Sequence, residues 1–146
     1  MAMKKRRLGT NQYLNVDLEV YSRSNLQPFV TAMGDKVLAL YVGRIKRTYR
    51  AHLELAGSGL SETPDSTIRT FCSLIRKLPR AALKLWNGAN HCDFNNGVQA
   101  RHKPDVYELS LTPETLAEAS GLNARIVLTI YGAGLGQSKP EPKGSV

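Results

Sequence analysis

The side chains best suited to metal binding or nucleophilic catalysis in this chain of 146 residues are its three histidines and two cysteines. They come closest together in the tripeptide His91-Cys92-Asp93. On a strand, His91 and Asp93 share one face while Cys92 points to the other, so Cys92 cannot complete a metal site with them. The chain has no CxxC, HxH or HExxH spacing, the patterns that bring ligands together locally. We therefore expect no metal, no cofactor and no catalytic residue.

An enzyme with an unfamiliar site is one alternative that these residues leave open. His91, Asp93 and His102 would be its first catalytic candidates, because a histidine beside a carboxylate can act as a general base. Cys92 would be the candidate nucleophile, with His91 or His102 as its base. Unchanged turnover after substitution of His91, Asp93 and His102 would exclude such a site.

Basic side chains are in excess, with 20 lysines and arginines against 12 aspartates and glutamates. The excess points to a polyanionic partner, nucleic acid above all. The first twelve residues hold four basic and no acidic side chains, whereas 13–131 hold 14 basic and 11 acidic ones and are only mildly basic. The possible polyanion-binding residues are Lys4, Lys5, Arg6 and Arg7 in the N-terminal run, and Arg44, Lys46, Arg47 and Arg50 further along.

A third basic run, from Arg69 to Lys84, also contains no acidic residue. If it shared a face with Arg44–Arg50, the two runs would form one basic surface. Both runs also match the solvated positions of a hairpin turn and of an amphipathic pair of helices. Asp17 and Glu19, on the polar face of the first predicted strand, would repel phosphate, so we expect no RNA-binding sheet and instead expect cross-strand ion pairs there.

The elements that must position these side chains follow from the hydrophobic periodicity and the capping residues. The nearly continuous apolar run at 37–42 is typical of a central strand. Ser24 is the expected cap of the first helix, and Gly34 its left-handed end. We predict strands at 13–23, 37–42, 49–55, 91–99, 106–111 and 125–131, and helices at 25–33, 63–78, 79–88 and 112–121.

The resulting order is β-α-β-β-α-(α)-β-β-α-β, which predicts an α+β fold. We expect a single domain at 13–131, with a largely antiparallel sheet and its helices on one face, and the first six elements match a ferredoxin-like order. The basic segment 1–12 and the segment 132–146, rich in glycine and proline, are predicted to be disordered tails. No apolar run is long enough for a membrane span or a secretion signal, so we expect a cytoplasmic protein without a membrane partner.

The C-terminal third carries a resemblance to a known family. The segment from Tyr107 to Glu114, the glycine at Gly121 and the strand Ile126–Tyr131 resemble the closing segment of a family of small uncharacterised bacterial domains. These domains are immunity-protein-like, and some are thought to protect cells against partner toxins. The resemblance implies a fold and a protein-binding class, but no residue role.

The leading interpretation is a non-enzymatic module that binds another protein, since the core patterning comes without a convergent set of polar residues. The alternative is a protein that binds nucleic acid or another polyanion through the basic N-terminus and residues 44–50. Salt dependence separates these two classes, because a polyanion complex weakens steeply as salt rises. The partner, the face that it uses and the oligomeric state do not follow from the sequence.

Overall fold

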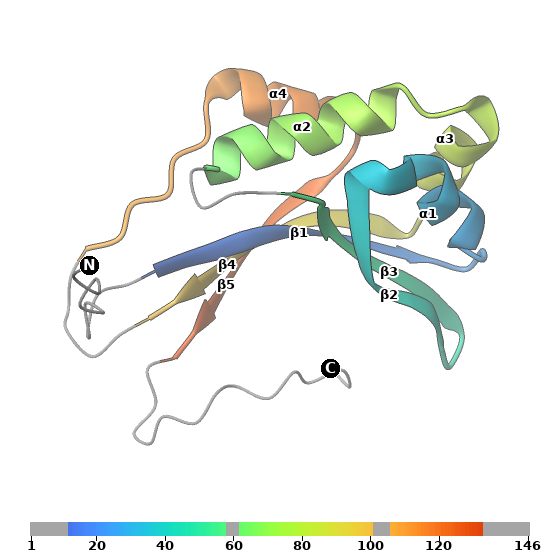
Figure 1. Ribbon diagram of the computed structural model, residues 1–146, viewed down its shortest axis with the longest axis horizontal. Helices are drawn as coiled ribbons and strands as arrows, with labels where there is room; N and C mark the ends of the chain where they lie inside the picture. Colours follow the sequence, from blue (N-terminus) through green and yellow to red (C-terminus); the bar gives the residue numbers. More distant parts are fainter. Residues whose placement is uncertain (1–11, 58–61, 101–105, 133–146) are drawn as a thin grey trace.

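The computed structural model describes residues 12–57, 62–100 and 106–132, which form one α+β domain (Figure 1). A sheet lies beneath a layer of helices, so that one face of the sheet is covered and the other is open. The elements in chain order are β1 (Gln12–Ser22), α1 (Gln27–Met33), a short 3-10 turn (Gly34–Lys36), β2 (Val37–Ile45), β3 (Thr48–Leu55), α2 (Pro64–Arg76), α3 (Arg80–Asn87), β4 (His91–Gln99), α4 (Pro113–Gly121) and β5 (Arg125–Tyr131).

The strands lie in the order β2-β3-β1-β4-β5. Every neighbouring pair is antiparallel except β4 and β5, which are parallel. The first four strands and their helices therefore have the strand arrangement of a ferredoxin-like plait, and β5 extends this sheet beyond β4. The predicted α+β class and its mostly antiparallel sheet are confirmed.

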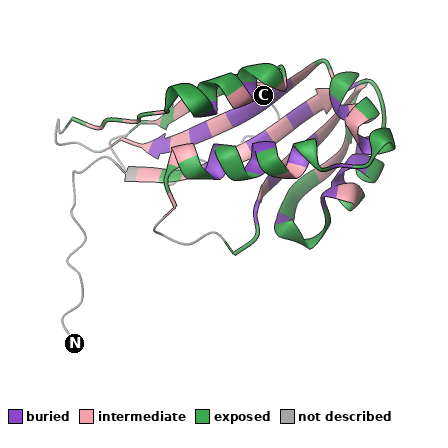
Figure 2. Ribbon diagram, turned by 90° about the horizontal axis from the view of Figure 1, so that it is seen from above, coloured by how far each residue is buried: buried purple, intermediate pink, exposed green. Residues whose placement is uncertain are grey.

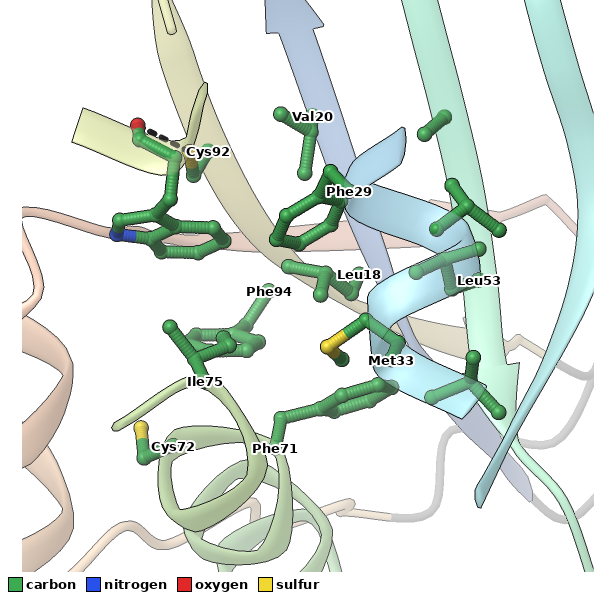
Figure 3. Close-up of a cluster of buried hydrophobic side chains, with 14 of the residues drawn as sticks. Leu18, Val20, Phe29, Met33, Leu53, Phe71, Cys72, Ile75, Cys92 and Phe94 are labelled. Atoms are coloured by element: carbon green, nitrogen blue, oxygen red, sulfur yellow. Dashed lines mark hydrogen bonds between the residues drawn. The ribbon is translucent and has the colours of Figure 1, made fainter. Parts of the chain in front are cut away.

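The core lies between the sheet and the helices (Figure 2). Alternation in β1 directs Leu18 and Val20 toward the helices, where they meet Leu53 of β3 and Phe94 of β4 (Figure 3). These side chains are almost completely buried. Because successive side chains on a strand point to opposite faces, the polar residues between them must face the open side.

The longest helix, α2, starts as its capping residues predict. Thr63 accepts a hydrogen bond from the backbone N–H of Ser66, and the Ser66 side chain accepts one from the N–H of Thr63, which forms a capping box. The helix buries a stripe that includes Phe71 and Cys72 against the sheet. Cys72 is thus a core residue, as its place on the apolar stripe predicts.

The prediction that 37–42 is a central strand is wrong. Within the described ranges, β2 is an edge strand that pairs with β3 alone, and Leu38 and Leu40 are half-exposed. A continuous apolar run is typical of a strand covered on both faces, but it does not reveal which strands pair. The neighbours of β2 are set by long-range contacts that the run itself does not encode.

The prediction of a strand at 106–111 is also wrong, because these residues belong to no strand of the sheet. Val106 is 88% exposed. Because β4 and β5 are parallel, the chain has to return along the sheet between them, and this segment is part of that return. Apolar and polar residues alternate at 106–111, but no strand pairs with this segment in the described part of the chain.

The first helix begins later than predicted. Its N-cap is Leu26 rather than Ser24, and the Asn25 side chain accepts a hydrogen bond from the N–H of Gln27. Gly34 has a positive φ of 74°, but its ψ of −153° lies outside the left-handed helical region. A 3-10 turn then leads into β2.

Several predictions concern residues outside the described ranges. These are the basic run Lys4–Arg7, His102 and most of the two predicted tails. Within the described ranges, every helix is too short or too polar to cross a membrane.

Candidate functional site

The open face of the sheet brings polar side chains from all five strands into rows. One row crosses the sheet from Tyr41 through His52, Glu19 and Asp93 to Arg125. The next row toward the β2–β3 hairpin places Arg50 beside Tyr21 and Tyr21 beside His91. The open face is therefore acidic along its middle and basic toward the hairpin.

An open hollow of about 1030 Å³ lies where the hairpin meets the end of β1 and the start of β4. We call it the basic hollow. Its lining contains the rings of Tyr21 and His91 but, among the described residues, no aspartate or glutamate. The cations that line it are Arg23, Arg44, Lys46, Arg47 and Arg50.

The hairpin turn is fixed by contacts of its own residues. Lys46 has a φ of 57°, and the Arg44 Nε donates a hydrogen bond of 3.0 Å to the Lys46 carbonyl oxygen. The Arg44 guanidinium also lies over the Tyr49 ring, 5.5 Å from its centroid. These contacts tie the Arg44 guanidinium to the backbone of the turn and to the Tyr49 ring.

Three planar groups stand together along one wall of the basic hollow. The Arg50 guanidinium is 5.0 Å from the centroid of the Tyr21 ring, and the His91 ring is 4.4 Å from that of Tyr21. Tyr21 donates a hydrogen bond to Glu19, and burial, followed by the charge of Glu19, raises the pKa of Tyr21 to about 12. The phenol therefore stays protonated and keeps its place in the wall.

A second carboxylate beside this wall, that of Asp93, is neutralised by its partners. Asp93 is almost fully buried and accepts hydrogen bonds of 2.7 and 2.9 Å from the guanidinium of Arg125. Its Oδ1 also lies 3.3 Å from Nδ1 of His91. The hydrogen bonds and charge of Asp93 raise the pKa of Arg125 in turn. Asp93 therefore adds little negative potential to the hollow.

The acidic centre of the open face consists of Asp17, Glu19 and Glu54. Glu54 accepts a hydrogen bond of 2.8 Å from Asn15, and Glu19 accepts one of 3.1 Å from Asn95. Asp17 Oδ1 is buried and has no such partner among the described residues. Burial and then the charges of Glu54 and Glu19 raise the pKa of Asp17 to about 7. Amide–carboxylate hydrogen bonds thus link β1 to β3 and to β4 across this face, and the ion pair of Asp93 with Arg125 links β4 to β5.

His52 lies between the acidic centre and the aromatic wall. Burial lowers its pKa, so the imidazole is neutral at neutral pH. Its ring makes edge contacts with Tyr21 and Tyr41, at centroid distances of 6.0 and 6.2 Å. Its Nε2 is buried without a hydrogen-bond partner in the described ranges. These contacts make His52 a packing residue of the face.

The structure brings together Arg44, Lys46, Arg47 and Arg50, which were all predicted as polyanion-binding residues. It adds Arg23, which the sequence analysis missed because it follows β1 in a different part of the chain. Pairing of β1 with β3 brings the two segments together, and no local pattern signals this. The other predicted run, Lys4–Arg7, lies outside the described residues.

The third basic run does not join this surface. On the helix layer, Arg69 lies 3.6 Å and Arg76 2.9 Å from carboxylate oxygens of Glu118. Since the helices cover the opposite face of the sheet (Figure 1), this run and the hairpin do not form one surface. Its charges are partly balanced within the helix layer.

The predicted catalytic candidates have no reactive arrangement among the described residues. His91 and Asp93 do share a face, as predicted, but Asp93 is occupied by Arg125. Cys72 and Cys92 are buried thiols, and burial raises their pKa values to about 11 and about 12. Neither thiol would ionise near neutral pH, so neither is a nucleophile. No cluster of three histidine, cysteine or carboxylate side chains suited to a metal ion occurs in the described ranges.

Comparisons of the chain with models of protein families, with curated proteins and with solved structures found no match.

Proposed function

We propose that the basic hollow binds the phosphate backbone of single-stranded nucleic acid. The observation that carries the proposal is the composition of its lining, in which five cations converge and no described carboxylate intervenes. Cations that neutralise phosphates release bound counterions, which supplies most of the free energy of nonspecific binding. The cytoplasmic location expected from the sequence would give the protein access to such ligands.

The planar wall supports a single strand rather than a duplex. Unpaired bases stack on aromatic rings and on guanidinium planes, and Arg50, Tyr21 and His91 supply both kinds of surface beside the cations. A small-molecule site is less suitable, because such pockets are mostly apolar and enclose their ligand. The basic hollow is open, and half of its lining residues are lysines or arginines.

Binding of another protein, in the manner of an immunity protein, stays a prediction. No feature of the basic hollow favours it over nucleic acid. An acidic polypeptide provides the direct comparison, since it matches nucleic acid in charge but has neither phosphates nor bases to stack.

The test is fluorescence anisotropy with a labelled single strand of about 12 nucleotides, which suits a site of this size. We expect a dissociation constant in the micromolar range at low salt and a steep loss of affinity as salt rises. A duplex of equal length should bind more weakly. Polyglutamate of equal charge should compete poorly, and equal competition would mean that the hollow is a general anion site.

Two double variants are decisive, because each removes two positive charges but from a different surface of the protein. R23Q/R47Q removes two cations of the basic hollow, and K77Q/R80Q removes two exposed cations of the helix layer. We expect the first pair to lower affinity by about tenfold or more and to reduce the salt slope by about two units, and the second to change affinity less than about twofold. Equal losses in both pairs would show that only net charge matters and would overturn the proposal.

The contribution of the N-terminal run is measured separately in the full chain. The variant K4Q/K5Q/R6Q/R7Q keeps the basic hollow intact. If it abolishes binding while R23Q/R47Q has no effect, the N-terminal run is the binding site and the hollow is not.

A further inference from the structure

The last strand, β5, leaves an apolar row uncovered at the edge of the sheet. Ile126, Leu128 and Ile130 face the helix layer, because they lie beside Phe94, Asn96 and Val98 of β4. They are nevertheless 37%, 53% and 61% exposed. Within the described residues, β5 pairs with β4 alone, so the backbone along its other side is unpaired.

The opposite edge of the sheet is built differently. The pairing of β2 with β3 shifts between Ala39 and Tyr41, and such an irregularity interrupts the regular edge that another strand would need. β5 pairs with β4 in unbroken register along its whole length. Its last six residues, 126–131, contain no proline and no charge, the two other common protections of an edge strand.

The sequence of β5 is complementary to itself in the antiparallel direction. When two copies of Arg125–Tyr131 pair over their full length, Leu128 lies opposite Leu128 of the second copy. Ile126 then lies opposite Ile130, which pairs apolar side chains with apolar side chains on the helix face. On the open face, Val127 meets Thr129 and Arg125 meets Tyr131. A two-fold axis normal to the sheet then lies midway between the two strands, at the level of Leu128.

We propose that β5 is a homodimer interface, in which two copies pair their β5 strands antiparallel around Leu128 to form one continuous ten-stranded sheet. Pairing over seven residues would supply about six to eight main-chain hydrogen bonds. It would also bury the exposed parts of Ile126, Leu128 and Ile130 in both copies.

Charge does not oppose this association. The one charged residue of β5 is Arg125, and Asp93 of the same chain already neutralises it. The two-fold axis also keeps both helix layers on the same side of the sheet. Leu116 of α4, which is 46% exposed, lies in that layer and can add apolar area where the two layers approach each other.

The test is sedimentation equilibrium of the full chain over a range of concentrations. We expect the wild type to reach twice the mass of the chain. L128K places two ammonium groups opposite each other at the axis and should weaken the dimer by about a hundredfold or more. L128E should do the same with two carboxylates.

The matched control is L38K on the other edge strand, because Leu38 and Leu128 are both 53% exposed leucines. We expect L38K to remain dimeric. Circular dichroism should show that all three variants are folded. A 1:1 mixture of L128K and L128E should restore the dimer, since opposite charges then meet at the axis.

Three results would overturn the proposal. They are a wild type that stays monomeric at every concentration, an L128K variant that dimerises like the wild type, and a mixture that stays monomeric. The inference does not rest on nucleic-acid binding, because none of the residues of β5 lines the basic hollow.

Discussion

The two regions of the open face, the acidic centre and the basic hollow, are built on the same strands but differ in how far their charged side chains are buried. In the acidic centre, Asp17 is mostly removed from water beside two other carboxylates, and its pKa rises to about 7. In the basic hollow, cations such as Arg23 and Arg47 are exposed. Burial, rather than the number of charges, therefore distinguishes the two regions. It suppresses the ionisation of Asp17 in the acidic centre, whereas the cations of the basic hollow are accessible to an anion.

The comparison also corrects the sequence-based view of this face. Asp17 and Glu19 predict a surface that repels phosphate, and both carboxyl groups lie in the acidic centre. The charge of the face changes from negative to positive toward the hairpin, because β3 brings Arg50 next to Tyr21. The proposed anion site lies at the end of a sheet face whose middle is acidic.

The largest expected effect is that of pH on the acidic centre. Asp17 binds its proton more tightly in the folded state, where the pKa is about 7, than in the unfolded chain, where it is 3.8. Its stabilising contribution is therefore full below pH 4 and is lost as pH rises through 7. Relative to D17N, the free energy of unfolding of the wild type should fall by about 2–4 kcal/mol between pH 4 and pH 8.

Urea unfolding of both proteins across this pH range checks the prediction. The lowered pKa of His52 acts in both proteins, so the difference between their curves isolates Asp17. Parallel curves would show that Asp17 has an ordinary pKa and that burial does not distinguish the two regions.

A smaller effect is expected at the boundary between the regions, where Asp93 and Arg125 pair. R125Q leaves a buried carboxylate without its strongest partner, whereas D93N leaves an exposed guanidinium that water can solvate. R125Q should therefore lower the midpoint of thermal unfolding by roughly 5–10 °C at pH 7, and D93N by less. Calorimetry of both variants measures this order. The reverse order would mean that the geometry of the pair, and not the burial of Asp93, decides its contribution.

The smallest effect concerns the influence of one region on the other. E19Q removes a negative charge beside the aromatic wall. Its one remaining oxygen can accept the hydrogen bond of Asn95, and its amide nitrogen can donate one to the Tyr21 hydroxyl oxygen. It should strengthen binding of the single strand by about twofold to threefold at low salt. E114Q, on α4 in the helix layer, removes the same charge elsewhere and should leave anisotropy titrations unchanged. Equal gains in both variants would indicate an effect of net charge alone.

The sequence by itself determined the elements whose signals are local. The capping residues at Thr63 and Thr112 set the starts of α2 and α4, and alternation in β1 set which side chains are buried. The strand predicted at 91–99 is β4, His91–Gln99. These features depend on hydrogen bonds and hydrophobic periodicity within a few residues of one another.

Only the tertiary structure decided which of these elements are neighbours. It placed β2 at an edge, left 106–111 outside the sheet and brought Arg23 to the hairpin cations, because each of these outcomes depends on contacts between distant segments. The same holds for Asp17, whose pKa is raised by burial in the folded sheet and then by the charge of Glu54 on another strand. Composition gave the chain its charges, but strand pairing determined which charges are hydrated and which are buried.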